Sequence, residues 1–249
     1  MPQFFVSSIS EDNTKAYITD IEDIKHISSV LRLRENDEIL AALKDNFSFN
    51  AKISKINKTL VELKVISKNK IKRTLNTRIT LIQSILKGQK QDLIIQKATE
   101  LGVDKIIPII SKNTVVKLFS DKDKEQKIER WQKIAYESVK QCERLDVPII
   151  ENILTLKEAL NLKDYDLRFV CAERNDDLTL RQFLTDFKKQ NNNIKNILII
   201  IGPEGGWSNE EFDLFNKENL PLISLGNLIL RAETAVVSAL SQVIYEYEL

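Results

Sequence analysis

Apolar and polar residues alternate in short runs along the first 70 residues of the chain. Alternation with a period of two is typical of strands that bury one face. The runs that we expect to form strands are 3–6, 15–18, 38–41, 47–53 and 60–66. One helix is expected between the second and third runs, because apolar residues recur at helical spacing from Ile21 to Leu31, after Asp20 as a suitable N-cap. This part of the chain is therefore predicted to be a small β-barrel.

The pattern changes from residue 79 onward, where apolar strands alternate with amphipathic helices. The expected strands are 79–85, 105–110, 167–171, 196–201 and 222–225. The expected helices are 89–101, 121–144, 156–160, 178–189, 208–217 and 233–247. Regular alternation of strands and helices predicts an α/β domain with a mainly parallel sheet.

A basic segment without a single acid, residues 68–78, separates the two patterns. We place the domain boundary there, with one domain at 1–70, a linker at 71–78 and a second domain at 79–249. A solvated linker would account for the charge. Lys72 and Arg73 would also suit the phosphates of an RNA backbone, in which case binding should weaken with added salt.

Glycine is rare in this chain, yet four of its six glycines lie at 202, 205, 206 and 226. The first three follow an uninterrupted apolar run, and ligands of open α/β sheets bind beyond the carboxyl ends of such strands. A tight strand-to-helix connection would explain the first loop alone. It does not explain the second loop, which leads through Arg231 and Glu233 into an apolar helix. We therefore predict that both loops line one pocket, with the loop after residue 171 as a third wall.

Composition narrows the function classes further. The net charge of the 249-residue chain is +1, so an anionic partner would have to meet a local basic patch. Two cysteines and one histidine give neither a disulfide framework nor a metal site. The chain has no dinucleotide fingerprint and no P-loop motif, which argues against those nucleotide sites. No apolar run approaches the ~20 residues of a membrane span, so we expect a cytoplasmic protein.

Two sequence motifs in the last third of the chain are specific enough to indicate a family. They are Ile-Gly-Pro-Glu-Gly-Gly at 201–206 and Leu-Gly-x-x-Ile-Leu-Arg-x-Glu-Thr-Ala at 225–235. They resemble the RsmE family of uridine-N3 methyltransferases of 16S ribosomal RNA, a branch of the SPOUT superfamily. Residues 26–39 and 96–103 resemble the same family, so the resemblance extends over the whole chain.

The resemblance implies a fold, a cofactor and partners. The fold would be a SPOUT-type α/β domain with a deep trefoil knot, preceded by a small PUA-like β-barrel that binds RNA. The cofactor would be S-adenosylmethionine, the substrate 16S rRNA of the small ribosomal subunit, and the active form a homodimer. The residues expected at the cofactor are Cys171, Ala172, Ile201, Gly202, Pro203, Gly206, Leu225, Gly226, Ile229, Leu230 and Thr234.

Methyl transfer to N3 of uridine requires loss of the N3 proton and a cation to stabilise the resulting negative charge. Arg231 is the expected cation, because arginine stays charged and its fork can engage a carbonyl oxygen. Glu233 or Glu204 would orient Arg231 or accept the proton. Arg32 and Arg34, beyond the predicted helix of the barrel, would contact RNA phosphates, although an ordinary solvated face would also carry such charges.

Two positions depart from the family pattern. The family typically carries arginine at the positions of Gln3 and Leu228, and both residues are uncharged here. Each change removes a guanidinium that could contact a phosphate or a second subunit.

Two other functions stay open at this point. The chain could methylate a different RNA or a different atom with the same cofactor. It could also be a non-catalytic RNA-binding factor of ribosome assembly, although the presence of Arg231, Glu233 and Thr234 argues against that.

Overall fold

A computed structural model describes residues 3–44, 47–69, 74–118, 120–173, 178–191 and 193–248. The chain forms two compact units. The first consists of Met1–Thr74 and Glu137–Val147, and the second of Leu75–Tyr136 and Pro148–Leu249. The second segment of the first unit was not anticipated, because its sequence continues a helical pattern of the other unit. Within the described residues, no helix is long and apolar enough to cross a membrane.

The first unit is built on a six-stranded sheet. Its strands are β1 (Gln3–Phe5), β2 (Ser8–Ile9), β3 (Lys15–Ile18), β4 (Glu38–Leu43), β5 (Phe47–Ile56) and β6 (Val61–Lys68), in the order β1-β4-β5-β6-β3-β2. β1 runs parallel to β4, and all other neighbours are antiparallel.

The sheet closes on itself because β1 and β2 are successive parts of one short stretch. Val6 N–H donates to the carbonyl of Ala42 in β4, and Ser7 N–H donates to the carbonyl of Tyr17 in β3. The stretch thus bridges the two edges of the sheet, and the predicted barrel is confirmed. The alternating apolar residues of the strands point into its interior. They include Phe4, Phe49 and the other members of one buried apolar cluster.

The predicted helix of the barrel is confirmed, with an unexpected ending. α1 (Ile21–Lys25) continues directly as a π-helical turn, His26–Val30. Asp20 is its N-cap, since its side chain accepts a hydrogen bond of 2.9 Å from the backbone N–H of Asp23. Asn36 has φ 74°, the left-handed conformation that asparagine tolerates better than most residues.

A buried ion pair joins the segment Glu137–Val147 to the barrel. Lys140 Nζ lies 2.7 Å from Asp23 Oδ1, and both side chains are almost fully buried. Burial raises the pKa of Asp23, and the hydrogen bond from Lys140 opposes that rise. Burial would lower the pKa of Lys140, but hydrogen bonds to Asp23 and Glu137 outweigh it and raise that pKa.

Gln3, one of the two departures from the family pattern, is fully buried. Its side-chain amide donates a hydrogen bond of 2.7 Å to the carbonyl of Arg144 in the same unit. Gln3 therefore supports the packing of Glu137–Val147 on the barrel, and its side chain is not available to RNA.

The second unit contains a parallel sheet, as predicted. Its strands are β7 (Arg78–Ser84), β8 (Lys105–Ile110), β9 (Ile149–Ile150), β10 (Leu154–Thr155), β11 (Leu167–Cys171), β12 (Asn196–Ile201) and β13 (Leu222–Ile223). The order is β10-β8-β7-β12-β11-β13, with β9 also paired to β8. β7 and β12 are central and read as continuous apolar runs because both of their faces are covered.

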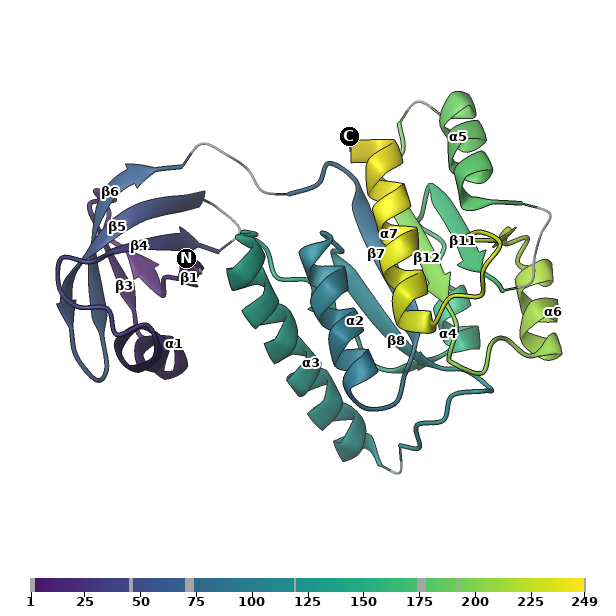
Figure 1. The fold of residues 1–249 in the computed structure, drawn as a ribbon, viewed down its shortest axis with the longest axis horizontal. Helices are drawn as coiled ribbons and strands as arrows, with labels where there is room; N and C mark the ends of the chain where they lie inside the picture. Colours follow the sequence, from purple (N-terminus) through teal and green to yellow (C-terminus); the bar gives the residue numbers. More distant parts are fainter. Residues whose placement is uncertain are drawn as a thin grey trace. The chain divides into compact units, whose positions relative to one another are not determined.

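The helices of the second pattern are α2 (Gln89–Glu100), α3 (Asp121–Cys142), α4 (Leu156–Leu160), α5 (Leu180–Gln190), α6 (Asn209–Lys217) and α7 (Ala232–Glu248). α7 lies along β12 and packs beside α2 (Figure 1). α6 begins with the capping box of Ser208 and Glu211, which the sequence predicts. α7 begins directly after the second glycine loop, which places that loop beside the end of β12.

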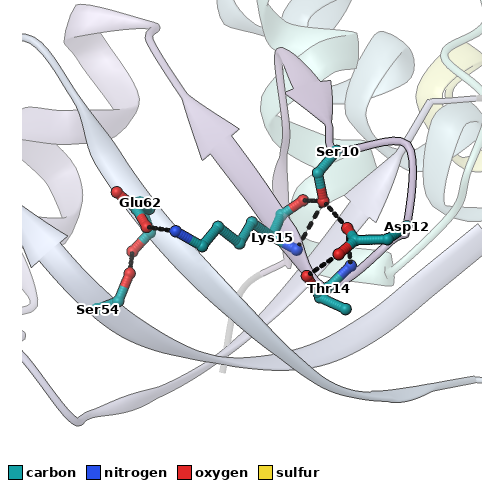
Figure 2. Close-up of polar contacts among 6 residues, drawn as sticks. All are labelled: Ser10, Asp12, Thr14, Lys15, Ser54 and Glu62. Carbon is teal, nitrogen blue, oxygen red and sulfur yellow. Dashed lines mark hydrogen bonds and ion pairs between the residues drawn. The ribbon is translucent and has the colours of Figure 1, made fainter.

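The ion pair of Lys140 and Asp23 generates a stability prediction. Lys140→Met should lower the free energy of unfolding by about 3–5 kcal/mol, because it leaves a carboxylate buried without its cation. The matched control is Lys15→Met, which removes an ion pair of 3.0 Å with Glu62 at the barrel surface (Figure 2). Because Lys15 is exposed and its ion pair is screened by solvent, that change should cost far less than the loss of Lys140. Urea unfolding measures the free energy of unfolding of both variants. Equal losses in the two variants would contradict a stabilising role for the buried ion pair.

Candidate functional site

A pocket of about 690 Å³ lies beyond the carboxyl ends of β11 and β12. Three segments form its walls: residues 171–173 after β11, residues 201–207, and residues 224–232 before α7. Lys90 of α2 and Ala235 of α7 complete the lining. We call residues 202–207 the glycine loop and residues 224–231 the arginine loop. A pocket of this size suits a ligand of the dimensions of a nucleoside with a side arm.

The structure brings most of the sequence-predicted residues together. Those that line the pocket are Cys171, Ala172, Ile201, Gly202, Pro203, Gly206, Leu225, Gly226, Ile229, Leu230 and Arg231. Thr234 and Glu233 are not part of the lining. The two glycine loops, about twenty residues apart in sequence, therefore bound one cavity.

Glycine is required at two places in the glycine loop for different reasons. A Cβ atom on Gly202 would lie 2.9 Å from Cε2 of the Trp207 indole, so a side chain there would displace the ring. Gly206 has φ 68°, a conformation that other residues rarely adopt, and its Cβ would lie 2.2 Å from Oε1 of Glu173. The loop thus follows a path that only residues without side chains can take at these points.

Three side chains donate hydrogen bonds to the carbonyl groups of the pocket's loops; Asn113 and Gln83 lie outside the pocket lining, and Trp207 is part of it. Asn113, after β8, donates through Nδ2 to the carbonyls of Gly205 at 3.2 Å and Gly206 at 3.0 Å. Gln83 at the end of β7 donates to the carbonyl of Gly202 at 3.2 Å. Trp207 Nε1 donates to the carbonyl of Cys171 at 3.0 Å. The sequence pointed to none of these bonds, because each donor lies far along the chain from its acceptor.

The arginine loop is anchored at its start and ends in the helix α7. The N–H and carbonyl of Ser224 bond to Leu178 and Leu180, both at 2.9 Å. Gly226 has φ 131°, and its N–H donates to Oγ of Ser224. At the other end, the carbonyl of Arg231 accepts the N–H of Ala235 at 2.8 Å. Arg231 therefore occupies the start of α7, and its side chain is exposed at the pocket.

The two carboxylates proposed to assist Arg231 lie in different surroundings. Oε1 of Glu204 accepts hydrogen bonds from Nζ of Lys90 at 3.2 Å and from the N–H of Lys87 at 3.4 Å. Glu204 is thus turned toward α2. One carboxylate oxygen of Glu233 is buried and has no hydrogen-bond partner within the described part of the chain. The structure records no ion pair of either carboxylate with Arg231 among these residues.

The pocket has no reactive thiol. Cys171 is buried, and burial raises its pKa to about 12, so the side chain stays a neutral thiol. Cys171 therefore lines the pocket without offering a thiolate. The residues that the structure describes include no group of three or more His, Cys, Asp or Glu side chains that could hold a metal ion.

Of the expected RNA-binding residues, Arg32 and Arg34 belong to the first unit. Arg32 and Arg34 are exposed, and Arg32 has φ 56° directly after the π-helical turn. The N–H of Arg34 donates to Oδ2 of Asp37 at 2.7 Å, which fixes the backbone there. Lys72 and Arg73 lie outside the described residues.

Comparison with known families assigns both parts of the chain. Residues 73–244 match the RNA methyltransferase domain, and residues 18–66 match the RNA methyltransferase PUA domain. The first match alone covers more than half of the chain.

Individual relatives match along their whole length. The ribosomal RNA small subunit methyltransferase E of Bacillus subtilis is 31% identical, over 100% of this chain and 98% of its own. That of Rickettsia conorii is 32% identical, over 97% and 94%. Among solved structures, the Neisseria gonorrhoeae ribosomal RNA small subunit methyltransferase E bound to S-adenosyl methionine superposes with a TM-score of 0.85 at 26% identity, over 99% of this chain and 98% of the other.

Proposed function

Since the chain belongs to the ribosomal RNA small subunit methyltransferase E family, we propose that it transfers a methyl group from S-adenosylmethionine to N3 of a uridine in 16S rRNA. The observation that carries the proposal is the meeting of the glycine and arginine loops at one pocket, with Arg231 at its edge. A protein that acts on the ribosomal small subunit would work in the cytoplasm.

The pocket residues fit an adenosyl cofactor. Most of the walls are backbone and apolar side chains, which suit an adenine ring and its sugar. Glu173 adds a carboxylate to the lining, suited to the positive charge of a sulfonium or an ammonium group. At Gly226 no heavy atom lies within 4 Å of the position that a Cβ would take, so a ligand can approach the backbone there. When bound, the cofactor would supply an electrophilic methyl group.

Arg231 has the position and charge to assist the transfer. When N3 of uridine loses its proton, negative charge spreads to the two neighbouring carbonyl oxygens, and a permanent cation beside them lowers the barrier. The guanidinium stays charged at any physiological pH. Glu204 is already engaged by Lys90, so the N3 proton would pass to Glu233 or to water.

We also infer that the chain is threaded through a trefoil knot in the second unit, as the resemblance to the SPOUT superfamily implies. The inference concerns residues 196–248, which supply both glycine loops and α7. Tracing this path in an experimental density map tests it, and an unthreaded path would end it.

Arg231→Ala should abolish methyl transfer while the affinity for S-adenosylmethionine stays within about threefold. The expected loss in kcat is about 10²–10³-fold, the range for removal of one group that stabilises developing charge. The assay incubates the variant with small subunits that lack the modification and with labelled cofactor, then maps the modified base. Arg181→Ala, which removes an exposed arginine from α5, is the control and should retain activity. Full activity of Arg231→Ala would remove this residue from the mechanism.

Arg32 and Arg34 are proposed to contact RNA phosphates. Replacing both with alanine should raise KM for small subunits at least several-fold and reduce the salt dependence of binding, while the affinity for the cofactor is unchanged. The double variant Arg32→Lys/Arg34→Lys keeps the charges and should retain most of the binding. An alanine pair with an unchanged KM would show that these arginines are only a solvated face.

A homodimer is proposed because the arginine loop exposes apolar side chains. Leu228 is 80% exposed and Ile229 is 62% exposed at the rim of the pocket. A second copy placed there would cover both and would give Leu228 a role in place of the family's arginine. Light scattering should give a mass about twice the 28.7 kDa of one chain. Leu228→Asp should shift the protein toward monomer, whereas Val115→Asp, at another exposed apolar side chain, should not. A monomeric parent protein would contradict the proposal.

A further inference from the structure

The walls of the pocket are loops, and loops do not hold their own shape. Backbone hydrogen bonds of strands and helices fix β11, β12 and α7, and Ala172 N–H continues the pairing of β11 with β13, but residues 202–207 lie outside any strand or helix. A loop that had to become ordered when a ligand binds would lose conformational entropy at that moment, and affinity would fall accordingly. The shape of this pocket therefore depends on the hydrogen bonds and packing contacts that other side chains make with these loops.

Asn113 supplies one of these contacts. Its single side-chain nitrogen donates to two successive carbonyls, those of Gly205 and Gly206, at 3.2 and 3.0 Å. Its Cβ also lies 3.0 Å from the position that a Cβ on Gly205 would take, so the side chain is packed against the loop. Asn113 does not line the pocket, so it acts on the glycine loop from the far side.

Trp207 supplies a second contact, and it joins two walls. Its indole N–H donates to the carbonyl of Cys171 at the end of β11, while its ring packs beneath Gly202 at the end of β12. The ring is fixed in turn by Phe215 of α6, with an edge-to-face geometry and a centroid distance of 4.9 Å. A movement of the indole would therefore shift both walls at once.

Gln83 completes the set of donors. It is fully buried, and its side-chain amide donates to the carbonyls of Ser84 at 2.7 Å and Gly202 at 3.2 Å. Together the three side chains bind the carbonyls of Cys171, Gly202, Gly205 and Gly206. The donors come from β7, from the loop after β8 and from the glycine loop itself, so the loop is tied to the rigid sheet.

We propose that Asn113 and Trp207 are positioning residues, which hold the pocket in the shape that binds S-adenosylmethionine before the cofactor arrives. The proposal rests on the proposed function for the identity of the cofactor. Neither residue takes part in the chemistry, so their contribution falls on cofactor affinity and not on the rate of transfer from the bound state.

Two substitutions remove the donors with little change in shape. Asn113→Asp replaces the amide with a carboxylate, which cannot donate and repels the two carbonyls. Trp207→Phe keeps an aromatic ring above Phe215 but removes the N–H. A lost hydrogen bond corresponds to about 0.5–1.5 kcal/mol, so each variant should raise Kd for S-adenosylmethionine about three- to tenfold. The turnover at saturating cofactor, kcat, should stay within about twofold of the parent.

The chain offers a matched control for each change. Asn191→Asp alters an asparagine whose amide also donates to a backbone carbonyl, that of Phe187, at the end of α5 and outside the pocket lining. Trp131→Phe makes the same aromatic change at a buried tryptophan of α3. Both controls should leave Kd and kcat unchanged, even if Trp131→Phe lowers the melting temperature. The chain has two tryptophans, so Trp131→Phe also leaves Trp207 as the sole indole, and its fluorescence should change when cofactor binds.

Calorimetric titration with S-adenosylmethionine, melting temperatures and steady-state kinetics decide the matter together. An increase in Kd and KM for the cofactor in both pocket variants, with kcat retained and the controls unaffected, supports the proposal. Unchanged affinity in Asn113→Asp and Trp207→Phe overturns it, as does a loss of affinity that the controls share in proportion to their loss of melting temperature. If the parent protein binds no S-adenosylmethionine, both the proposed function and the positioning role are wrong. If the parent binds it and the two pocket variants bind it equally well, only the positioning role is wrong.

Discussion

The shape of the pocket depends on one steric constraint: the glycine loop must pass close to the residues that surround it, without side chains of its own at the points of contact. Gly202 and Gly206 meet this constraint because a Cβ at either position would collide with Trp207 or with Glu173. Gly226, at φ 131°, allows the arginine loop to turn back toward the same cavity. The parallel sheet positions both loops, since the glycine loop follows β12, the arginine loop follows β13, and both strands are parallel neighbours of β11 whose carboxyl ends share one edge.

The glycine loop has three glycines among its six residues, so few side chains are available to order it. The hydrogen bonds that order the glycine loop therefore come from its backbone carbonyls, which accept from Asn113 and Gln83. This arrangement leaves the inner side of the loop free for a ligand. Arg231, directly before the first residue of α7, lines the same pocket.

The sequence predicts the elements of both units well, because the period of the apolar pattern and the caps are local signals. It predicts the pocket because glycines are rare in this chain and cluster in two loops. It does not reveal β2, which has two residues and no periodicity to detect. It also does not show that Glu137–Val147 packs on the barrel through Lys140, or that Gln3 and Asn113 bind distant carbonyls. Such contacts are set by tertiary structure, and no local pattern encodes which polar side chain will meet which carbonyl.

The most direct test of the account is a crystal structure of the protein with S-adenosylmethionine. The account predicts the adenosyl group between the glycine loop and the arginine loop, against the backbone of Gly202 and Gly226, with the methyl group on the side of Arg231. It also predicts that the hydrogen bonds of Asn113 and Trp207 are the same with and without the ligand. A cofactor bound elsewhere on the chain, or one that binds there only after both loops have rearranged, would contradict it.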